Sequence, residues 1–344
     1  MKRLIGLGAV LALMAAAAVA CGGDDGAVTT TSASVSTPVS ASASDAPTTT
    51  GGAAADEDLV LADGRLVIPG QNVGDVDLTA LPVGDDSLVD TPTVGGLHLC
   101  DTFPTDGGGA QVAGPWFSED GTTFDLTQKA FVLGEVTWDD AYFEVAVDGE
   151  ERVLTGNDLP VGHTTGDFPI AGDDPAAEYD RNPSAIVENA YEIRLPAEPT
   201  EAAEPGCVGG ESGVLLSGVV LNSPVDAMGR DAVAWESQDH CEGHPNPSGY
   251  HYHSVSACVP DEGTGHSDLV GYALDGYGIF GHRGEDGEVV TNDDLDECHG
   301  HTHEVELDGE VVEAYHYHAT WEYPYAVGCF HGEVSIEGPL NPPE

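Results

Sequence analysis

The chain has 344 residues, of which 61 are Asp or Glu and only 9 are Lys or Arg, so its formal charge is −52. A surface this acidic repels the phosphates of nucleic acids and the headgroups of anionic lipids, and we expect neither as a partner. The acidic residues show no EF-hand spacing of Asp, Asn, Gly and Glu. We therefore expect most of them to solvate the surface.

The N-terminus has the pattern of a bacterial secretory signal peptide. Lys2 and Arg3 precede an apolar stretch over residues 4–19, and small residues then lead to Cys21. We predict a lipoprotein signal peptide at residues 1–20 and a lipid on Cys21. The lipid would hold the protein on the extracytoplasmic side of the cell membrane. An ordinary secreted protein, cut near the same position, is the alternative.

A low-complexity segment follows. Residues 27–55 are almost entirely Ala, Ser, Thr, Val, Pro and Gly, with Asp45 as the one charge. Such a composition cannot bury a core, so we predict a flexible tether over residues 21–58. The remainder is predicted to contain an N-terminal β region at 59–160, to which we assign no role, and a second domain at 161–335.

The folded part is predicted to be all-β, with short strands and long loops. Alternating or β-branched runs at 131–138, 142–147 and 152–154 predict strands, and the last two are joined across Asp148-Gly149, a hairpin turn. The chain has 45 glycines and 22 prolines, and these residues break the runs into short segments. Helical periodicity is hard to find, which favours the all-β class.

The C-terminal half contains an internal duplication. Residues 218–258 and 271–329 share four blocks in the same order. The blocks read G-x-x-L-[ND], D-x-C-x-G-H, Y-H-Y-H and a final Cys, and the first of them pairs residues 218–222 with 271–275. The spacers differ in length, so we expect insertions in loops around a common frame.

These blocks resemble the YHYH domain family. The resemblance rests on the two Y-H-Y-H tetrapeptides and on NSPVDAMGRDAV (222–233), QDHCEGHP (238–245), GYALDGYGIFG (271–281) and YPYAVG (323–328). Residues 163–169 (HTTGDFP) are similar to an upstream segment of the family, so the resemblance extends over about 163–332. It implies an exported or surface domain more firmly than it implies a reaction.

The histidines point to a transition-metal site. Side chains at i and i+2 of a strand share a face, so His251 and His253 point away from their tyrosine neighbours. Each Y-H-Y-H is also preceded by a Gly-His. Neutral imidazole suits Zn²⁺ and Cu²⁺. The predicted ligands are His244, His251, His253, His301, His316 and His318.

Other assignments of the histidines remain open. The same His and Tyr side chains would also suit a buried hydrogen-bond network without metal. His299, His301 and His303 form a second alternating series, which is either part of a site or a solvated loop. We expect structural roles for His98, His163, His266, His282 and His331.

The cysteines are predicted to form disulfides. Six remain once Cys21 carries lipid, and an even number in an exported chain favours three bridges. Cys-x-x-His spacing also suits zinc, but an oxidising compartment disfavours free thiolates. The economical pairing is Cys241–Cys258, Cys298–Cys329 and Cys100–Cys207, with crossed pairings left open.

Three carboxylates accompany the histidines. Asp239 and Asp296 occupy equivalent positions in the repeats and are predicted to be ligands or to orient an imidazole. Asp275, aligned with Asn222, is a weaker candidate ligand, because Asp-Gly is also a common turn former.

Three functions fit these observations. The first is a surface domain that captures or stores Zn²⁺ or Cu²⁺, with both Y-H-Y-H strands meeting in one shared cleft. The second is a metal-dependent enzyme, a hydrolase or oxidoreductase, in which an Asp handles protons. The third is a metal-free glycan-binding or adhesion module that stacks its ligand on Trp235, Trp321, Tyr323 and Tyr325. No sequence motif specifies a substrate.

Overall fold

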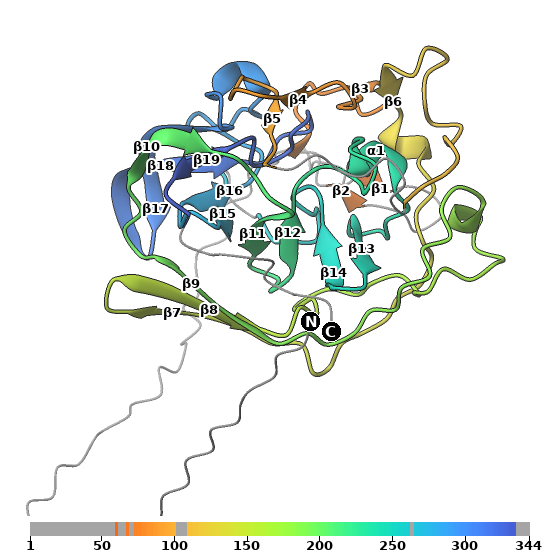
Figure 1. Cartoon of the computed structure of the whole chain (residues 1–344), viewed down its shortest axis with the longest axis horizontal. Helices are drawn as coiled ribbons and strands as arrows, with labels where there is room; N and C mark the ends of the chain where they lie inside the picture. The colour runs from red at the N-terminus through yellow and green to blue at the C-terminus, as the bar shows by residue number, and fades with distance from the viewer. Residues whose placement is uncertain (1–58, 61–66, 69–71, 101–108, 262–264, 335–344) are drawn as a thin grey trace, which may run out of the picture. The chain divides into compact units, whose positions relative to one another are not determined.

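The computed structural model describes residues 59–60, 67–68, 72–100, 109–261 and 265–334 (Figure 1). Contacts divide the chain into the units Met1–Ala53 and Ala54–Glu344, and every described residue belongs to the second. The predicted signal peptide, Cys21 and the tether lie outside the described residues. In the ranges that are described, no helix combines the length and apolar character needed to cross a bilayer.

The all-β prediction is confirmed. Within the described residues the regular structure consists of short strands, the single α-helical turn α1 (Ala232–Trp235) and a few 3₁₀ turns. The side chain of Asp231 caps α1 by accepting hydrogen bonds from the backbone N–H groups of Val233 and Ala234. The 3₁₀ turns include η2 (Leu126–Gln128), η3 (Pro175–Glu178) and η4 (Asn292–Asp294).

The largest sheet contains the duplication. Its eight strands run in the order β13-β14-β12-β11-β15-β16-β18-β17, so each half repeats the other in reverse about the β11–β15 pair. Figure 1 shows β13 and β14 at one end of this row and β17 and β18 at the other. The strands are β11 (Glu211–Leu215), β12 (Val220–Asn222), β13 (Gly243–Asn246), β14 (Gly249–Tyr252), β15 (Leu269–Ala273), β16 (Gly278–Phe280), β17 (Gly300–Leu307) and β18 (Glu310–His318).

The strand pairing corrects the alignment of the first block of the repeat. Strand β12 runs parallel to β14, and its counterpart β16 runs parallel to β18. Strands β11 and β15 are therefore equivalent. Gly213 pairs with Leu221 of β12 as Gly271 pairs with Ile279 of β16, so Gly213 occupies the position of Gly271. The predicted pairing of residues 218–222 with 271–275 is wrong. With the correct register the counterpart of Asp275 is Ser217, and Asn222 corresponds to Phe280.

A second sheet has three strands, β7 (Phe143–Asp148), β8 (Glu151–Gly156) and β9 (Tyr191–Pro196). The predicted hairpin across Asp148-Gly149 is confirmed, because β7 and β8 pair in antiparallel register up to Asp148 and Glu151. Residues 131–138 do not form the predicted strand. Only isolated bridges involve this segment, because Val132 and Val136 pair with single residues of distant loops.

Short two-stranded pairs complete the described structure. They are β1 (Leu59–Val60) with β2 (Val67–Ile68), β3 (Leu81–Pro82) with β6 (Thr123–Phe124), β4 (Leu88–Val89) with β5 (Leu97–His98), and β10 (Glu201–Gly206) with β19 (Phe330–Gly332). One hydrophobic core includes residues from Leu78 to Phe330, so the region before residue 160 packs with the duplicated sheet.

Three disulfides join the cysteines in the pairing that the sequence favours: Cys100–Cys207, Cys241–Cys258 and Cys298–Cys329. The second and third bridges are equivalent in the two repeats. Each connects the loop that precedes a histidine strand to the segment that follows the Y-H-Y-H, and thereby restrains the geometry around the histidines.

Candidate metal centres

The first group of histidines is formed by His244, His251 and His253. His244 on β13 lies directly opposite His251 on β14, and His253 follows two residues later on the same face. All three side chains are buried, and one nitrogen from each lies within 4.8 Å of the others. The Nε2 atoms of His244 and His253 are 3.1 Å apart.

Glu236, the residue that follows α1, adds a carboxylate to this group. Its Oε2 lies 3.2 Å from Nε2 of His244 and 3.3 Å from Nε2 of His253. Zinc bonds of about 2.0–2.1 Å in tetrahedral geometry separate neighbouring donor atoms by about 3.3 Å. The three atoms therefore have the spacing of one tetrahedral face. We call Glu236 and the three histidines the first-repeat site.

A pocket of about 920 Å³ reaches the first-repeat site, and all four residues of the site line it. Its walls come from the loop of residues 177–184, the end of β12, the β13–β14 hairpin and the segment around Val112. The buried donor atoms are therefore accessible from a space that is much larger than a metal ion.

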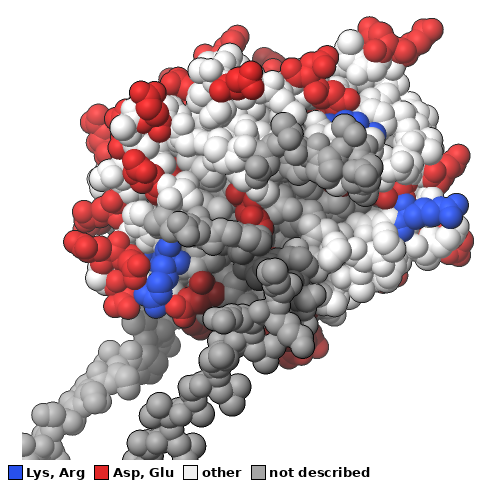
Figure 2. Space-filling view, in the orientation of Figure 1, with Lys and Arg blue, Asp and Glu red and all other residues white. Residues whose placement is uncertain are grey.

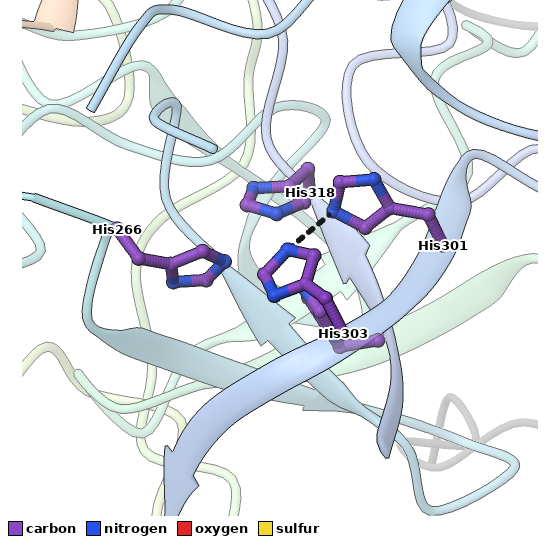
Figure 3. Close-up of side chains that lie close together, drawn as sticks. His266, His301, His303 and His318 are labelled. Atoms are coloured by element: carbon purple, nitrogen blue, oxygen red, sulfur yellow. Dashed lines mark hydrogen bonds between the residues drawn. The ribbon is translucent and has the colours of Figure 1, made fainter. Parts of the chain in front are cut away.

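The second group of histidines has five members, and one nitrogen from each lies within 4.8 Å of the others. Figure 3 shows the rings of His266, His301, His303 and His318 pointing toward a common centre. His301 and His303 come from β17, His318 comes from β18, and His266 precedes β15. The Nε2 atoms of His301 and His303 are 2.9 Å apart. The second-repeat site consists of His266, His301, His303, His316 and His318.

Backbone carbonyls set the tautomer of the histidines in both Y-H-Y-H strands. Nδ1 of His253 lies 2.6 Å from the carbonyl of Ser223, and Nδ1 of His318 lies 2.7 Å from that of Gly281. A carbonyl only accepts hydrogen bonds, so each Nδ1 carries the proton and each Nε2 presents a lone pair. Nδ1 also faces a carbonyl in three other histidines, His251, His316 and His266.

The environment favours neutral imidazoles in the second-repeat site. Burial, together with the smaller effect of the neighbouring histidines, lowers the pKa of His316 to about 3 and that of His301 to about 4. In the first-repeat site, burial acts to raise the pKa of Glu236, but His244 and, to a smaller extent, His253 override it and hold that pKa well below its usual range. The first site therefore contains a carboxylate anion, and the second contains only imidazoles.

Several of these nitrogens are buried without a hydrogen-bond partner. Among the described residues, none hydrogen-bonds to Nε2 of His266, His316 or His318. A buried polar atom without a hydrogen-bond partner lowers the stability of the folded protein by about 1–3 kcal/mol. Three such nitrogens close together are therefore unfavourable unless a ligand binds them. Lone pairs that converge in this way fit a bound transition-metal ion.

The carboxylates singled out in the sequence have structural contacts. Asp239 accepts hydrogen bonds from the backbone of Cys241 and from the hydroxyl of Tyr250, and Asp296 accepts the equivalent bonds from Cys298 and Tyr315. Neither belongs to the two groups of histidines. Each instead ties the cysteine loop of its repeat to the first tyrosine of Y-H-Y-H.

Asp275 has a similar role. Its Oδ2 accepts hydrogen bonds from the hydroxyl of Tyr317 at 2.5 Å and from the backbone of Gly332 at 2.9 Å. Gly276 follows with a φ of +95°, a conformation that favours glycine. Asp275 therefore starts a turn and supports the histidine strand from its tyrosine face. In the first repeat, the hydroxyl oxygen of its counterpart Ser217 lies 3.3 Å from the hydroxyl oxygen of Tyr252.

The structure separates the two histidine strands. Strands β14 and β18 are the second and seventh of the eight strands, which places them about 24 Å apart at the usual strand spacing. The prediction of one shared cleft is therefore wrong. The repeats do pack about a pseudo-twofold axis, but β11 and β15 meet there, and the histidine strands lie near the two ends of the sheet.

The proposed stacking surface is also wrong, because its aromatic rings contribute to the core. Trp321, Tyr323 and Tyr325 are buried, and Trp235 is partly buried against Phe117. The sulfurs of the Cys-x-x-His pairs are joined in disulfides and are not free to bind zinc. His299 is buried and bonds through Nε2 to Thr320, so it lies outside the second-repeat site.

Sequence reasoning missed or left open three residues of the two sites. His303 could have been identified from its position two residues after His301 in an alternating series. His266 and Glu236 follow no repeated motif, because each comes from a segment outside the four blocks. Only the fold brings these two residues to the histidine strands.

Comparison with protein families supports the resemblance noted in the sequence. The model of the family described as YHYH protein matches residues 192–288, so the chain carries a YHYH domain. The match includes the first Y-H-Y-H and ends before the second, and it is narrower than the expected 163–332. Neither the curated proteins nor the solved structures contain a match to this chain.

Proposed function

We propose that this protein is a lipid-anchored, extracytoplasmic metal-binding protein that holds two transition-metal ions, one in each repeat. The observation that carries the proposal is the convergence of buried imidazole lone pairs. His266, His316 and His318 each bring one nitrogen to the same point, their Nδ1 atoms face backbone carbonyls, and no described residue hydrogen-bonds to their buried Nε2 atoms. A metal-free network would need a proton donor for each of these nitrogens.

The donor sets suggest which ions bind. Imidazole nitrogen suits Zn²⁺ and Cu²⁺, and hard cations prefer oxygen. The first-repeat site combines three imidazoles with the carboxylate of Glu236, and the donor atoms of Glu236, His244 and His253 have tetrahedral spacing, which fits Zn²⁺. The five imidazoles of the second-repeat site are equally compatible with Zn²⁺ and Cu²⁺.

The surface would favour the capture of cations. Figure 2 shows Asp and Glu side chains spread over the visible face, with few Lys or Arg side chains among them. Such a charge distribution raises the local concentration of divalent cations. The sequence before Cys21 supports attachment to a membrane by lipid. Palmitate labelling that depends on Cys21 would test the anchor, and labelling of Cys21→Ser would refute it.

Metal analysis of the purified full chain tests the central part of the proposal. The chain is stripped with a chelator, reloaded with Zn²⁺, dialysed and measured by elemental analysis. We expect two ions per chain. A chain that retains no ion after loading, in a folded state with its disulfides intact, would contradict the proposal and favour the metal-free network.

A further inference from the structure

The pocket above the first-repeat site has the size of a small-molecule site. Its volume of about 920 Å³ lies in the upper part of the range of about 300–1,000 Å³ that is usual for sites holding organic ligands. A hydrated metal ion needs only a small part of this space. Entry of the metal alone therefore does not account for the pocket.

The lower part of the pocket is a built polar site. Glu236 is 7% exposed, His244 is 4% exposed, and His251 and His253 are each 5% exposed, yet all four line the pocket. A ligand in the pocket would lie directly over the metal-binding atoms. Zinc held by three protein ligands, such as the three histidines, keeps a fourth position for a donor atom from a bound molecule.

The walls indicate the charge of the ligand. Six acidic residues and one arginine line the pocket, namely Asp158, Glu178, Asp180, Glu211, Asp226, Glu236 and Arg181. The chain as a whole carries a formal charge of −52, which adds to the repulsion of anions. Apolar contacts come from prolines and from Val112 and Val225. An uncharged ligand with an apolar body fits these walls better than an anion.

We propose that the pocket of the first-repeat site binds an uncharged small organic molecule, whose lone-pair donor coordinates the metal held by His244, His251 and His253 and whose body fills the pocket. This inference rests on the proposed metal-binding function. It gives the first-repeat site a ligand-binding role that the second-repeat site, with its five imidazoles, does not share.

The test uses the full chain loaded with Co²⁺, whose visible absorption bands report changes in coordination. The probes are imidazole, 4-phenylimidazole and the anion oxalate, added at slightly alkaline pH. We expect 4-phenylimidazole to change the spectrum and to bind about tenfold more tightly than imidazole, because its ring is buried in the pocket. Oxalate is expected to bind more weakly than either.

Two variants separate the pocket from the metal. Val112 is a half-exposed pocket residue, so Val112→Trp is expected to obstruct the pocket without touching a metal ligand. Val311→Trp, at an exposed position on β18, is the matched control. We expect both variants to retain Co²⁺ and only Val112→Trp to lose the preference for 4-phenylimidazole.

The outcomes distinguish the two proposals. If Co²⁺ binds but no probe changes the spectrum, or if 4-phenylimidazole gains nothing over imidazole, the pocket proposal fails and the metal proposal stands. If oxalate binds most tightly, the assignment of an uncharged ligand fails. If Co²⁺ does not bind to the first-repeat site, both proposals fail.

Discussion

The two repeats place three histidines identically and complete their sites differently. His244 and His301 lie opposite His251 and His316 in the same antiparallel register, and a third histidine comes two residues after His251 and two after His316. Beyond this shared trio, the first-repeat site adds Glu236 and opens into a pocket. The second-repeat site adds His266 and His303. Strand geometry thus conserves the trio, while the additional donors come from segments that differ between the repeats.

The origin of the difference can be traced to single positions. His303 lies two residues after His301 on β17, and the same step from His244 on β13 leads to Asn246. Asn246 instead accepts a hydrogen bond from the backbone of Ser248 in the tight β13–β14 turn. The longer β17–β18 hairpin moves its turn away from the site, so the second repeat has room for another imidazole.

Removal of two ligands from one repeat should have the largest effect. We expect His316→Ala together with His318→Ala to lower the affinity of the second-repeat site roughly 1000-fold or more, because a structural metal site derives several kcal/mol from each ligand. The first-repeat site should keep its ion at unchanged affinity. Calorimetric titration with Zn²⁺ measures both. Weaker binding at both sites would mean that the repeats are coupled.

Asp239 is expected to contribute to stability and not to metal binding. It is fully buried and accepts hydrogen bonds from the backbone of Gly166 and Cys241 and from the hydroxyl of Tyr250. Asp239→Ala should lower the free energy of unfolding of the metal-free chain by about 3 kcal/mol, since it leaves buried donors unsatisfied. Denaturant titration measures the loss.

The matched variant is Asp296→Ala, which removes the equivalent but less buried carboxylate. Its cost should be smaller, and both variants should retain two metal ions. Loss of an ion from either variant would return these carboxylates to the role of ligands.

Glu236 should distinguish the two sites. Glu236→Gln removes the anionic donor, so we expect the affinity of the first-repeat site for Zn²⁺ to fall roughly 10- to 100-fold, with the second-repeat site unaffected. Asp293 precedes Cys298 by the same number of residues as Glu236 precedes Cys241, so Asp293 is the equivalent position in the second repeat. Its side chain is exposed. Asp293→Asn is therefore the control, with no expected effect. Equal losses in the two variants would indicate a general electrostatic effect.

The sequence predicts the local features of these sites and not their long-range ones. The i, i+2 histidines, the disulfide partners and the hairpin at Asp148-Gly149 depend on neighbouring residues or on the repeated blocks, and the structure contains each of them. Glu236 and His266 depend on how separate segments pack, which no periodicity encodes.

The wrong predictions have the same cause. The repeats were expected to meet at their histidine strands, but the antiparallel pairing of β11 with β15 forms the central contact. Matching by residue identity also aligned Asn222 with Asp275, although strand pairing places Ser217 there. The role of Asp239, Asp296 and Asp275 as ligands or as residues that orient an imidazole stays a prediction, and the hydrogen bonds of their side chains are to the tyrosines of the strands.

Anomalous X-ray diffraction from crystals of the Zn²⁺-loaded chain tests the central claim most directly. We predict two separate peaks at the zinc edge. One should lie among Glu236, His244, His251 and His253, and the other should lie among the five histidines of the second repeat, near the opposite end of the sheet. A single peak shared by both Y-H-Y-H strands, or no peak at either group of histidines, would contradict the account.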